Sequence, residues 1–356
     1  MNQRIENIRR KMQKADLQGM IITNSSNLRY VLGFDVEGMI FITDKENLFI
    51  TDGRYIEYAN SKLTIDDDIA VVNIADLSTD DNLAFFADCD RVGFEEYDLT
   101  YYDYTNMVQK YRISEMVETN GIVEKLRIIK DDDEIRSLEK ACLITDKCFE
   151  HLKTFIKIGM TEIEVAAILE FNQRKRGANG TSFDTIVASG KRSAMPHGVA
   201  SNKKIENNEF ITIDYGCYLD GYASDITRTV FIGNNIEPRM KEIYETVRKS
   251  NELGCKSLKA GIKGKDVDKI VRDFMGDDEQ YFGHSLGHCL GLELHETPLL
   301  SMRENSYLEE GMVITVEPGI YIPGYAGVRI EDDLVITKDG SRSLTTLPKE
   351  LIKLEV

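Results

Sequence analysis

Histidine is scarce in this chain and concentrated in one short stretch. Only five of the 356 residues are histidine, and three of them, His284, His288 and His295, lie within residues 283–298 (GHSLGHCLGLELHETP). Histidine binds metals often and exchanges protons readily near neutral pH. The stretch contains three glycines at four-residue intervals, each costing a helix about 1 kcal/mol relative to alanine. No glutamate follows the first histidine, as a helical HExxH zinc motif would require. We therefore expect a glycine-rich loop or strand end that approaches a ligand closely.

Two carboxylates close apolar segments, and a further acid follows each of them on the next predicted strand. Asp214 closes the segment FITID and Glu317 closes MVITVE, and each is followed by a second acid, Asp225 and Glu331 respectively. A buried, ionised carboxylate costs several kcal/mol unless it is paired or binds a metal. Four such groups with no excess of basic residues nearby would repel one another, and a pair of divalent cations bridged by carboxylates removes that repulsion.

One neutral imidazole, that of His288, would complete a ligand set dominated by oxygen. Such a set suits Mn²⁺ best, with Co²⁺ or Zn²⁺ as alternatives, rather than a thiolate zinc site. Cys289, beside this histidine, is expected to pack near the site rather than to bind the metal.

The two acid pairs belong to a repeated pattern. Residues 214–223 (DYGCYLDGYA) and 317–326 (EPGIYIPGYA) match at six of ten positions, five identical residues and an acid at the first position of each, at a constant offset of 103 residues. The repeat predicts two related halves, each contributing a hairpin that carries two carboxylates.

Apolar periodicity predicts the elements that position these residues. Helical patterns cover residues 5–18, 98–111, 135–156, 237–258 and 264–275, and another helix opens at a capping box, Thr161 to Glu164. Strands are expected at 19–23, 39–43, 47–51, 91–95, 185–188, 209–215, 224–232, 311–317 and 328–336. We predict a smaller α/β domain over residues 1–123, without catalytic residues, and an α+β domain over residues 124–356. His151 lies within a predicted helix, where a packed or solvated histidine is expected rather than a ligand.

Composition excludes several classes of partner. The formal net charge of −17 argues against nucleic acid and anionic membrane surfaces, which both require clustered basic residues. No apolar run approaches the roughly 18 residues that span a bilayer, and from the charged, amphipathic start of the sequence we expect no signal peptide. Six cysteines without a CxxC pair indicate free thiols in a reducing, cytoplasmic environment.

The ordered carboxylates and histidine carry a resemblance. The set resembles the five-ligand dinuclear site of the pita-bread metallopeptidases, the family of methionine aminopeptidase, aminopeptidase P and prolidase, and it comprises Asp214, Asp225, His288, Glu317 and Glu331. The resemblance implies a pita-bread catalytic domain with pseudo-twofold halves, preceded by a creatinase-like domain. It further implies that Asp214 binds one metal ion in bidentate fashion, that Asp225 and Glu331 bridge, and that His288 and Glu317 bind the other ion.

Further residues resemble those of the Xaa-Pro members of this family. His284 and Arg329 resemble residues of those members rather than of methionine aminopeptidases, and His197 and His295 match the family's upstream and downstream histidines. The resemblance implies a hydroxide that bridges the metals as nucleophile, with Glu317 moving its proton to the leaving nitrogen. It implies that His197 and His295 donate to the carbonyl and the tetrahedral intermediate. His284 would line the proline side of the cut, and Arg329 would orient Glu331 or hold a substrate carboxylate.

We therefore expect an exopeptidase that cleaves the bond between an amino-terminal residue and a proline at the second position of a peptide. The resemblance also implies a homodimer. Aminopeptidase P and prolidase, which differ in substrate length, both remain open. Two alternatives are a catalytically inactive binding module on this fold and a metal-free, creatinase-like hydrolase. Metal content and Xaa-Pro cleavage before and after chelation distinguish these possibilities.

Overall fold

The computed structural model describes residues 3–78, 86 and 88–354, which form two compact units, Met1–Arg127 and Ile128–Val356. The boundary expected after residue 123 falls within helix α6 (Ile122–Arg127). The last residue of this helix belongs with the first unit, because the guanidinium of Arg127 donates to the side chain of Asn27 over 2.7 Å.

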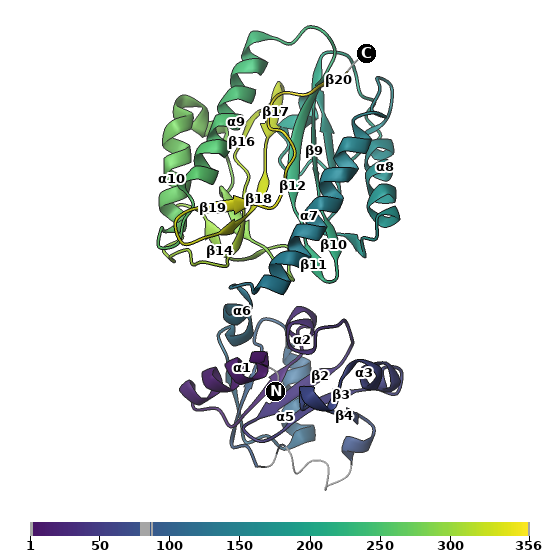
Figure 1. Ribbon diagram of the computed structural model, residues 1–356, viewed down its shortest axis with the longest axis vertical. Helices are drawn as coiled ribbons and strands as arrows, with labels where there is room; N and C mark the ends of the chain where they lie inside the picture. The colour runs from purple at the N-terminus through teal and green to yellow at the C-terminus, as the bar shows by residue number, and fades with distance from the viewer. Residues whose placement is uncertain (1–2, 79–85, 87, 355–356) are drawn as a thin grey trace. The chain divides into compact units, whose positions relative to one another are not determined.

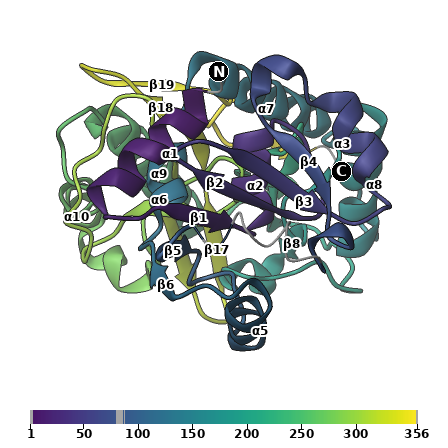
Figure 2. The same cartoon turned by 90° about the horizontal axis from the view of Figure 1, so that it is seen from below.

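The first unit contains a six-stranded mixed sheet, in the order β4-β3-β2-β1-β5-β6. Its strands are β1 (Gly19–Ile22), β2 (Met39–Thr43), β3 (Asn47–Thr51), β4 (Ala70–Asn73), β5 (Arg91–Phe94) and β6 (Glu115–Glu118). Its other helices are α1 (Gln3–Lys14), α2 (Ser25–Leu32), α3 (Ile56–Lys62) and α5 (Tyr101–Tyr111), with short 3₁₀ turns at Ile65–Asp67 and Asp76–Ser78. The predicted α/β character and the four predicted strands are confirmed, and Figure 2 shows β1, β2 and β3 side by side.

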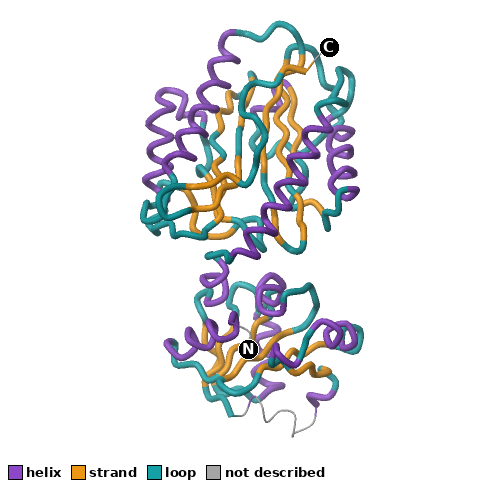
Figure 3. The backbone as a smooth tube through the Cα atoms, viewed as in Figure 1, coloured by secondary structure: helices purple, strands orange, loops and turns teal. Residues whose placement is uncertain are grey.

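The second unit places its long helices on two sides of its strands (Figures 1 and 3). The helices are α7 (Asp132–Leu152) and α8 (Glu162–Lys175) on one side, and α9 (Pro238–Ser257) and α10 (Gly264–Met275) on the other. The strands are β7 (Gly180–Thr181), β8 (Ile186–Ser189), β9 (Glu209–Tyr215), β10 (Cys217–Leu219), β11 (Tyr222–Ala223), β12 (Ile226–Ile232), β13 (Gly287–Cys289), β14 (Glu296–Leu300), β15 (Val313–Val316), β16 (Gly319–Ile322), β17 (Ala326–Arg329), β18 (Asp332–Ile336), β19 (Ser341–Ser343) and β20 (Lys353–Leu354). Two 3₁₀ segments complete it, η3 (Gly190–Ala194) and η4 (Gly276–Tyr281).

The repeated sequence pattern corresponds to a repeated structure. In the first half, β9 pairs with β12 and the hairpin β10–β11 connects them; in the second half, β15 pairs with β18 around the hairpin β16–β17. Each half has its own apolar core, one around α7 and α8 and one around α10. The α+β architecture with two related halves is therefore confirmed.

The structure shows where two predicted helices begin or end. The predicted capping box is present, since Thr161 accepts from the N–H of Glu164 and Glu164 accepts from that of Thr161. The helix expected to run to residue 156 ends at Leu152, although Ile156 remains buried in the core beyond it.

The prediction of a single strand over residues 328–336 is wrong. The chain forms two strands there, because β17 pairs with β16 whereas β18 pairs with β15 in a different sheet. Ile330 and Glu331 lie in the interruption, where the chain passes from one sheet to the other. None of the described helices combines the length and apolar character that a bilayer-spanning segment needs.

Candidate active site

The predicted site residues line one cavity of about 630 Å³ in the second unit. Its wall includes all nine of them: His197, Asp214, Asp225, His284, His288, His295, Glu317, Arg329 and Glu331. Apolar side chains complete the wall, among them Phe183, Val199, Leu294 and Leu299. Residues separated by up to 134 positions in the sequence therefore meet because both halves direct their strand ends to one place.

Three of the predicted ligands surround a single point. Ligand atoms of Asp225, His288 and Glu331 lie within 4.8 Å of one another, and all three residues are buried. Glu317 adjoins this group, with Oε1 at 3.6 Å from Nε2 of His288. Asp214 lines the same cavity and is engaged through Oδ2 by the guanidinium of Arg329.

The backbone fixes the tautomer of His288 that a metal requires. Nδ1 lies 3.1 Å from the carbonyl oxygen of Cys289, which can only accept, so the neutral ring carries its proton on Nδ1. The lone pair of Nε2 therefore faces Oδ2 of Asp225 at 3.6 Å. A backbone carbonyl that orients a ligating imidazole is a common arrangement in metal sites.

Burial and the charges of neighbouring acids disfavour ionisation of Asp225 and Glu331. Burial, reinforced by the charges of Asp214, Asp333 and Glu317, raises the pKa of Asp225 well above its usual range. Burial also raises the pKa of Glu331 well above its usual range, and Asp225 adds to that effect.

The donor set fits divalent cations. Among the described residues, Oδ1 of Asp214 and Oδ1 of Asp225 are buried without a hydrogen-bond partner. A buried oxygen of this kind is costly unless something satisfies it. Carboxylate oxygens with one imidazole suit Mn²⁺ and related ions, and a cation would both satisfy these atoms and remove the repulsion.

A chain of hydrogen bonds joins His284 to Arg329 through a tyrosine. Nδ1 of His284 faces the carbonyl of Ser285 at 2.8 Å, so Nε2 accepts from the hydroxyl of Tyr321 at 2.9 Å. The same hydroxyl accepts from Nη1 of Arg329 at 2.8 Å. Burial, with the charge of Arg329, lowers the pKa of His284 to about 3, so its ring is neutral at physiological pH.

The two remaining predicted histidines are more exposed. His197 lies in the loop after η3, and the ring of His295 stands 4.4 Å from that of His288, centroid to centroid. Burial and the neighbouring histidines lower the pKa of His295, so that it is neutral and can donate a hydrogen bond. His151, in the last turn of α7, packs against Phe155 just beyond the end of that helix, as the sequence predicted.

Sequence reasoning missed several residues that hold the site together. Tyr321 bridges His284 and Arg329, and the hydroxyl of Thr227 donates to Glu331 over 2.6 Å while accepting from Arg329. Asp333 accepts from the N–H of Asp225 over 3.0 Å. Tyr321 had a signal, since it occupies the tyrosine position shared by the two copies of the repeat. The others had none, because each is an ordinary polar residue within an apolar strand.

Comparison with known protein families matches residues 136–338 to metallopeptidase family M24. Residues 4–129 match the creatinase/prolidase N-terminal domain. The two matches cover the second and first structural units, respectively.

Similar proteins match over almost the whole chain. A Xaa-Pro dipeptidase of Pyrococcus horikoshii is 39% identical over 99% of both chains. The solved structure of a Xaa-Pro dipeptidase from Bacillus anthracis has a TM-score of 0.94 at 43% identity, covering 99% of each chain. The structure of an X-Pro aminopeptidase from Thermotoga maritima has a TM-score of 0.89 at 35% identity, covering 97% of this chain and 99% of that one.

Proposed function

Because this chain belongs to metallopeptidase family M24, we propose that it is a dinuclear-metal exopeptidase that hydrolyses the bond between an amino-terminal residue and proline. The observation that carries the proposal is the convergence of Asp225, His288 and Glu331 within 4.8 Å, in a cavity that also holds Glu317 and Asp214. A cluster of acids with buried, unsatisfied oxygens is stable when ionised only if cations neutralise it.

We propose a Xaa-Pro dipeptide as the substrate, with longer Xaa-Pro peptides as the second candidate. Two relatives at 39% and 43% identity are named Xaa-Pro dipeptidases, and one at 35% is named an X-Pro aminopeptidase. The cavity volume of about 630 Å³ accommodates a dipeptide. The imide nitrogen of proline has no N–H, so recognition of this residue depends on the shape of the pocket.

We propose that Asp214, Asp225, His288, Glu317 and Glu331 hold two divalent cations, with Mn²⁺ as the native metal and Co²⁺ or Zn²⁺ as alternatives. Cations bound by these residues would polarise the scissile carbonyl and lower the pKa of water enough for nucleophilic attack near neutral pH. Elemental analysis of protein purified without added metal identifies the ion.

Side chains of the site also orient the substrate and transfer protons. Glu317 is the general base and acid, and its side chain is partly open to the cavity. His197 and His295 donate hydrogen bonds to the substrate carbonyl as negative charge develops on its oxygen. Arg329 orients the acids through its contacts with Asp214 and Thr227, and His284 contacts the proline side of the substrate.

The proposal is tested by measuring cleavage of Ala-Pro, Met-Pro and Met-Pro-Ala-Ala before chelation, after chelation and after return of Mn²⁺. We expect cleavage that chelation abolishes and Mn²⁺ restores, and we expect the dipeptides to be cleaved faster than the tetrapeptide. Glu331→Gln should lower kcat/KM at least 100-fold, whereas the exposed Asp339→Asn should leave it unchanged. Full activity of Glu331→Gln would refute the proposal, and metal-independent cleavage of creatine would support the creatinase-like alternative.

We also propose that the protein is a cytoplasmic homodimer. The six cysteines are free thiols, which supports a reducing compartment. Light scattering coupled to size-exclusion chromatography measures the mass of the particle, and a monomeric mass near 40.5 kDa would refute the dimer.

A further inference from the structure

Glu317 and Glu331 lie at the same junction between two sheets, where Glu317 follows the end of β15 and Glu331 precedes the start of β18. β15 pairs with β18 as far as Val316 opposite Asp332, and the separate pairing of β16 with β17 begins at Gly319 opposite Arg329. Between these two ladders the chain passes Glu317 on one side and Glu331 on the other. The distance between these two carboxylates therefore depends on what holds the junction together.

A single carboxamide from helix α9 spans this junction. Asn251 is fully buried, and its Nδ2 donates to the carbonyl oxygen of Val316 over 2.8 Å and to that of Ile330 over 3.2 Å. These carbonyls directly precede Glu317 and Glu331. An amide nitrogen has two hydrogens, so one side chain ties both backbones at a fixed separation.

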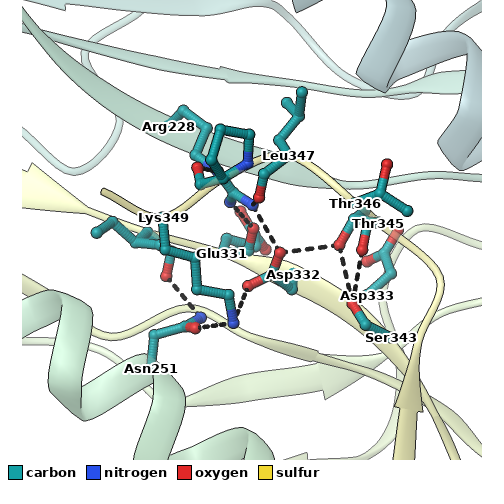
Figure 4. A network of polar contacts seen from close by, with 12 residues as sticks. Arg228, Asn251, Glu331, Asp332, Asp333, Ser343, Thr345, Thr346, Leu347 and Lys349 are labelled. Carbon is teal, nitrogen blue, oxygen red and sulfur yellow. Dashed lines mark hydrogen bonds and ion pairs between the residues drawn. The ribbon is translucent and has the colours of Figure 1, made fainter. Parts of the chain in front are cut away.

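The orientation of this carboxamide is itself fixed. Its oxygen accepts from Nζ of Lys349 over 2.5 Å, and an ammonium group has only donors, so the amide cannot turn over without losing this bond. Lys349 also pairs with Asp332 over 2.8 Å, and Asp332 accepts from Arg228 over 2.7 Å. Figure 4 shows this network, in which Arg228 also donates to the backbone carbonyl of Glu331.

We infer that Asn251 is a positioning residue, which sets the separation of Glu317 and Glu331 and thereby the affinity of the site for metal. The inference rests on the proposed role of these two acids as ligands. Residues behind the ligands of a metal site commonly change metal affinity 10- to 100-fold when they are replaced. Asn251 touches neither acid side chain, so it acts only through the backbone at the junction.

The test uses Asn251→Asp, which preserves the shape of the side chain and the acceptor that faces Lys349. It replaces the two donors with an oxygen that faces two carbonyl oxygens. We expect the Kd of the chelator-treated, full-length protein for Mn²⁺, measured by titration calorimetry, to rise about 10- to 100-fold. The visible absorption spectrum of the Co²⁺-loaded variant should also change, because the ligand geometry changes.

A matched control separates this role from general stability. Asn172 is buried on α8, and its Nδ2 donates to a backbone carbonyl, that of Ile168, over 2.7 Å. Asn172→Asp should lower the melting temperature while leaving the Mn²⁺ affinity and the Co²⁺ spectrum unchanged. An equal loss of Mn²⁺ affinity in Asn172→Asp would overturn the inference.

If Asn251→Asp does not fold, Lys349→Met tests the same junction less directly, because it keeps both donors but removes the ammonium that orients the amide and that also pairs with Asp332. We expect a rise in Kd of about 3- to 10-fold. Wild-type affinity in the folded Asn251→Asp protein, or in Lys349→Met when that variant is the one used, would overturn the role of Asn251. Wild-type protein that binds no Mn²⁺ would refute the proposed function as well, so the two failures are distinguishable.

Discussion

Tyr321 is the residue through which His284 and Arg329 act on each other. Its hydroxyl donates to Nε2 of His284 and accepts from Nη1 of Arg329. Because Arg329 in turn contacts Asp214, the tyrosine connects the proposed proline side of the cavity to the proposed metal ligands. A hydroxyl in this place fixes the orientation of a neutral imidazole, since the other nitrogen of that ring is already engaged by a carbonyl.

Replacing Tyr321 by Phe should lower kcat/KM about 10- to 100-fold, because the histidine ring and the arginine lose a shared partner in a buried site. Metal content should remain that of the wild-type protein, since no proposed ligand is changed. Steady-state kinetics and elemental analysis check both expectations. The control is Tyr325→Phe in the same hairpin, whose hydroxyl donates to Glu237 over 2.8 Å, and it should retain activity. A wild-type kcat/KM in Tyr321→Phe would contradict this role.

At the scale of elements, one buried carboxylate holds both ends of the loop that carries His197. Glu162, in the first turn of α8, accepts from the N–H and hydroxyl of Ser189 at 2.8 and 2.9 Å. It also accepts from the N–H and hydroxyl of Ser201 at 3.1 and 2.6 Å, and from Arg192 at 3.0 Å. The segment is thus fastened near its beginning, at Ser189 and Arg192, and at its end, at Ser201.

Replacing Glu162 by Gln should release this loop, because an amide nitrogen cannot accept the bonds that one carboxylate oxygen accepts now. We expect kcat/KM to fall about 10-fold or more through misplacement of His197, with unchanged Mn²⁺ affinity. The unchanged Mn²⁺ affinity distinguishes this variant from Asn251→Asp, in which the affinity should fall. Glu164→Gln, two residues further along the same helix, changes only the exposed capping box and should leave kinetics unaffected. Loss of Mn²⁺ affinity in Glu162→Gln would argue against a role confined to the loop.

The segment that carries His295 depends on a buried ion pair. Lys130 and Glu296 meet at 2.6 Å, and their side chains are 1% and 3% exposed. Lys130→Met should therefore cost about 3–5 kcal/mol of unfolding free energy, because it removes the ammonium that compensates a buried carboxylate. Adding Glu296→Gln to this variant should recover part of that loss. Urea unfolding of the two single variants and the double variant measures the coupling, and strictly additive losses would exclude it.

At the scale of the whole molecule, the sequence predicts what is encoded locally. Apolar periodicity predicted most helices and strands, because each such pattern lies within a few neighbouring residues. The repeat around Asp214 and Glu317 predicted two halves, because each short copy can be recognised in the sequence although the copies lie 103 residues apart. The interruption between β17 and β18, at Ile330 and Glu331, could not be predicted. An apolar run in the sequence does not reveal that its first part pairs in one sheet and its second part in another.

The contacts that hold the site were equally beyond the sequence. Asn251 meets Val316 across 65 residues, and Lys130 meets Glu296 across 166. No sequence pattern around a single buried polar residue on a helix indicates which distant residues it will contact. Only the packing of α9 against the junction of the sheets gives Asn251 its two acceptors.

The clustering of acids also determines how the whole protein responds to pH when metal is absent. Burial raises the pKa of Glu317 to about 7, and the charge of Asp214 contributes to the rise. In the unfolded chain this carboxyl group titrates near its ordinary value of 4.5. Between these two values Glu317 binds more proton in the folded protein than in the unfolded chain, so its contribution to the unfolding free energy falls as the pH rises. His284, whose pKa burial lowers to about 3, contributes in the opposite direction below pH 6.5, with metal or without it. Arg228 and Lys349 outweigh burial and lower the pKa of Asp332 to about 2, so this acid titrates below that range.

We therefore predict that metal-free protein loses up to about 3 kcal/mol of unfolding free energy through Glu317 between pH 4.5 and 7, since one pKa unit corresponds to about 1.4 kcal/mol. Protein loaded with Mn²⁺ should not show this loss above pH 6, because a cation stabilises the ionised carboxylates that burial disfavours. Urea unfolding at pH 5, 6 and 7, with chelator or with excess Mn²⁺, measures both series. The difference between the two series isolates the acids, because the histidine contribution is common to both. A difference that does not grow from pH 5 to pH 7 would show that the acids do not repel one another, and the electrostatic reason for placing two cations among them would be lost.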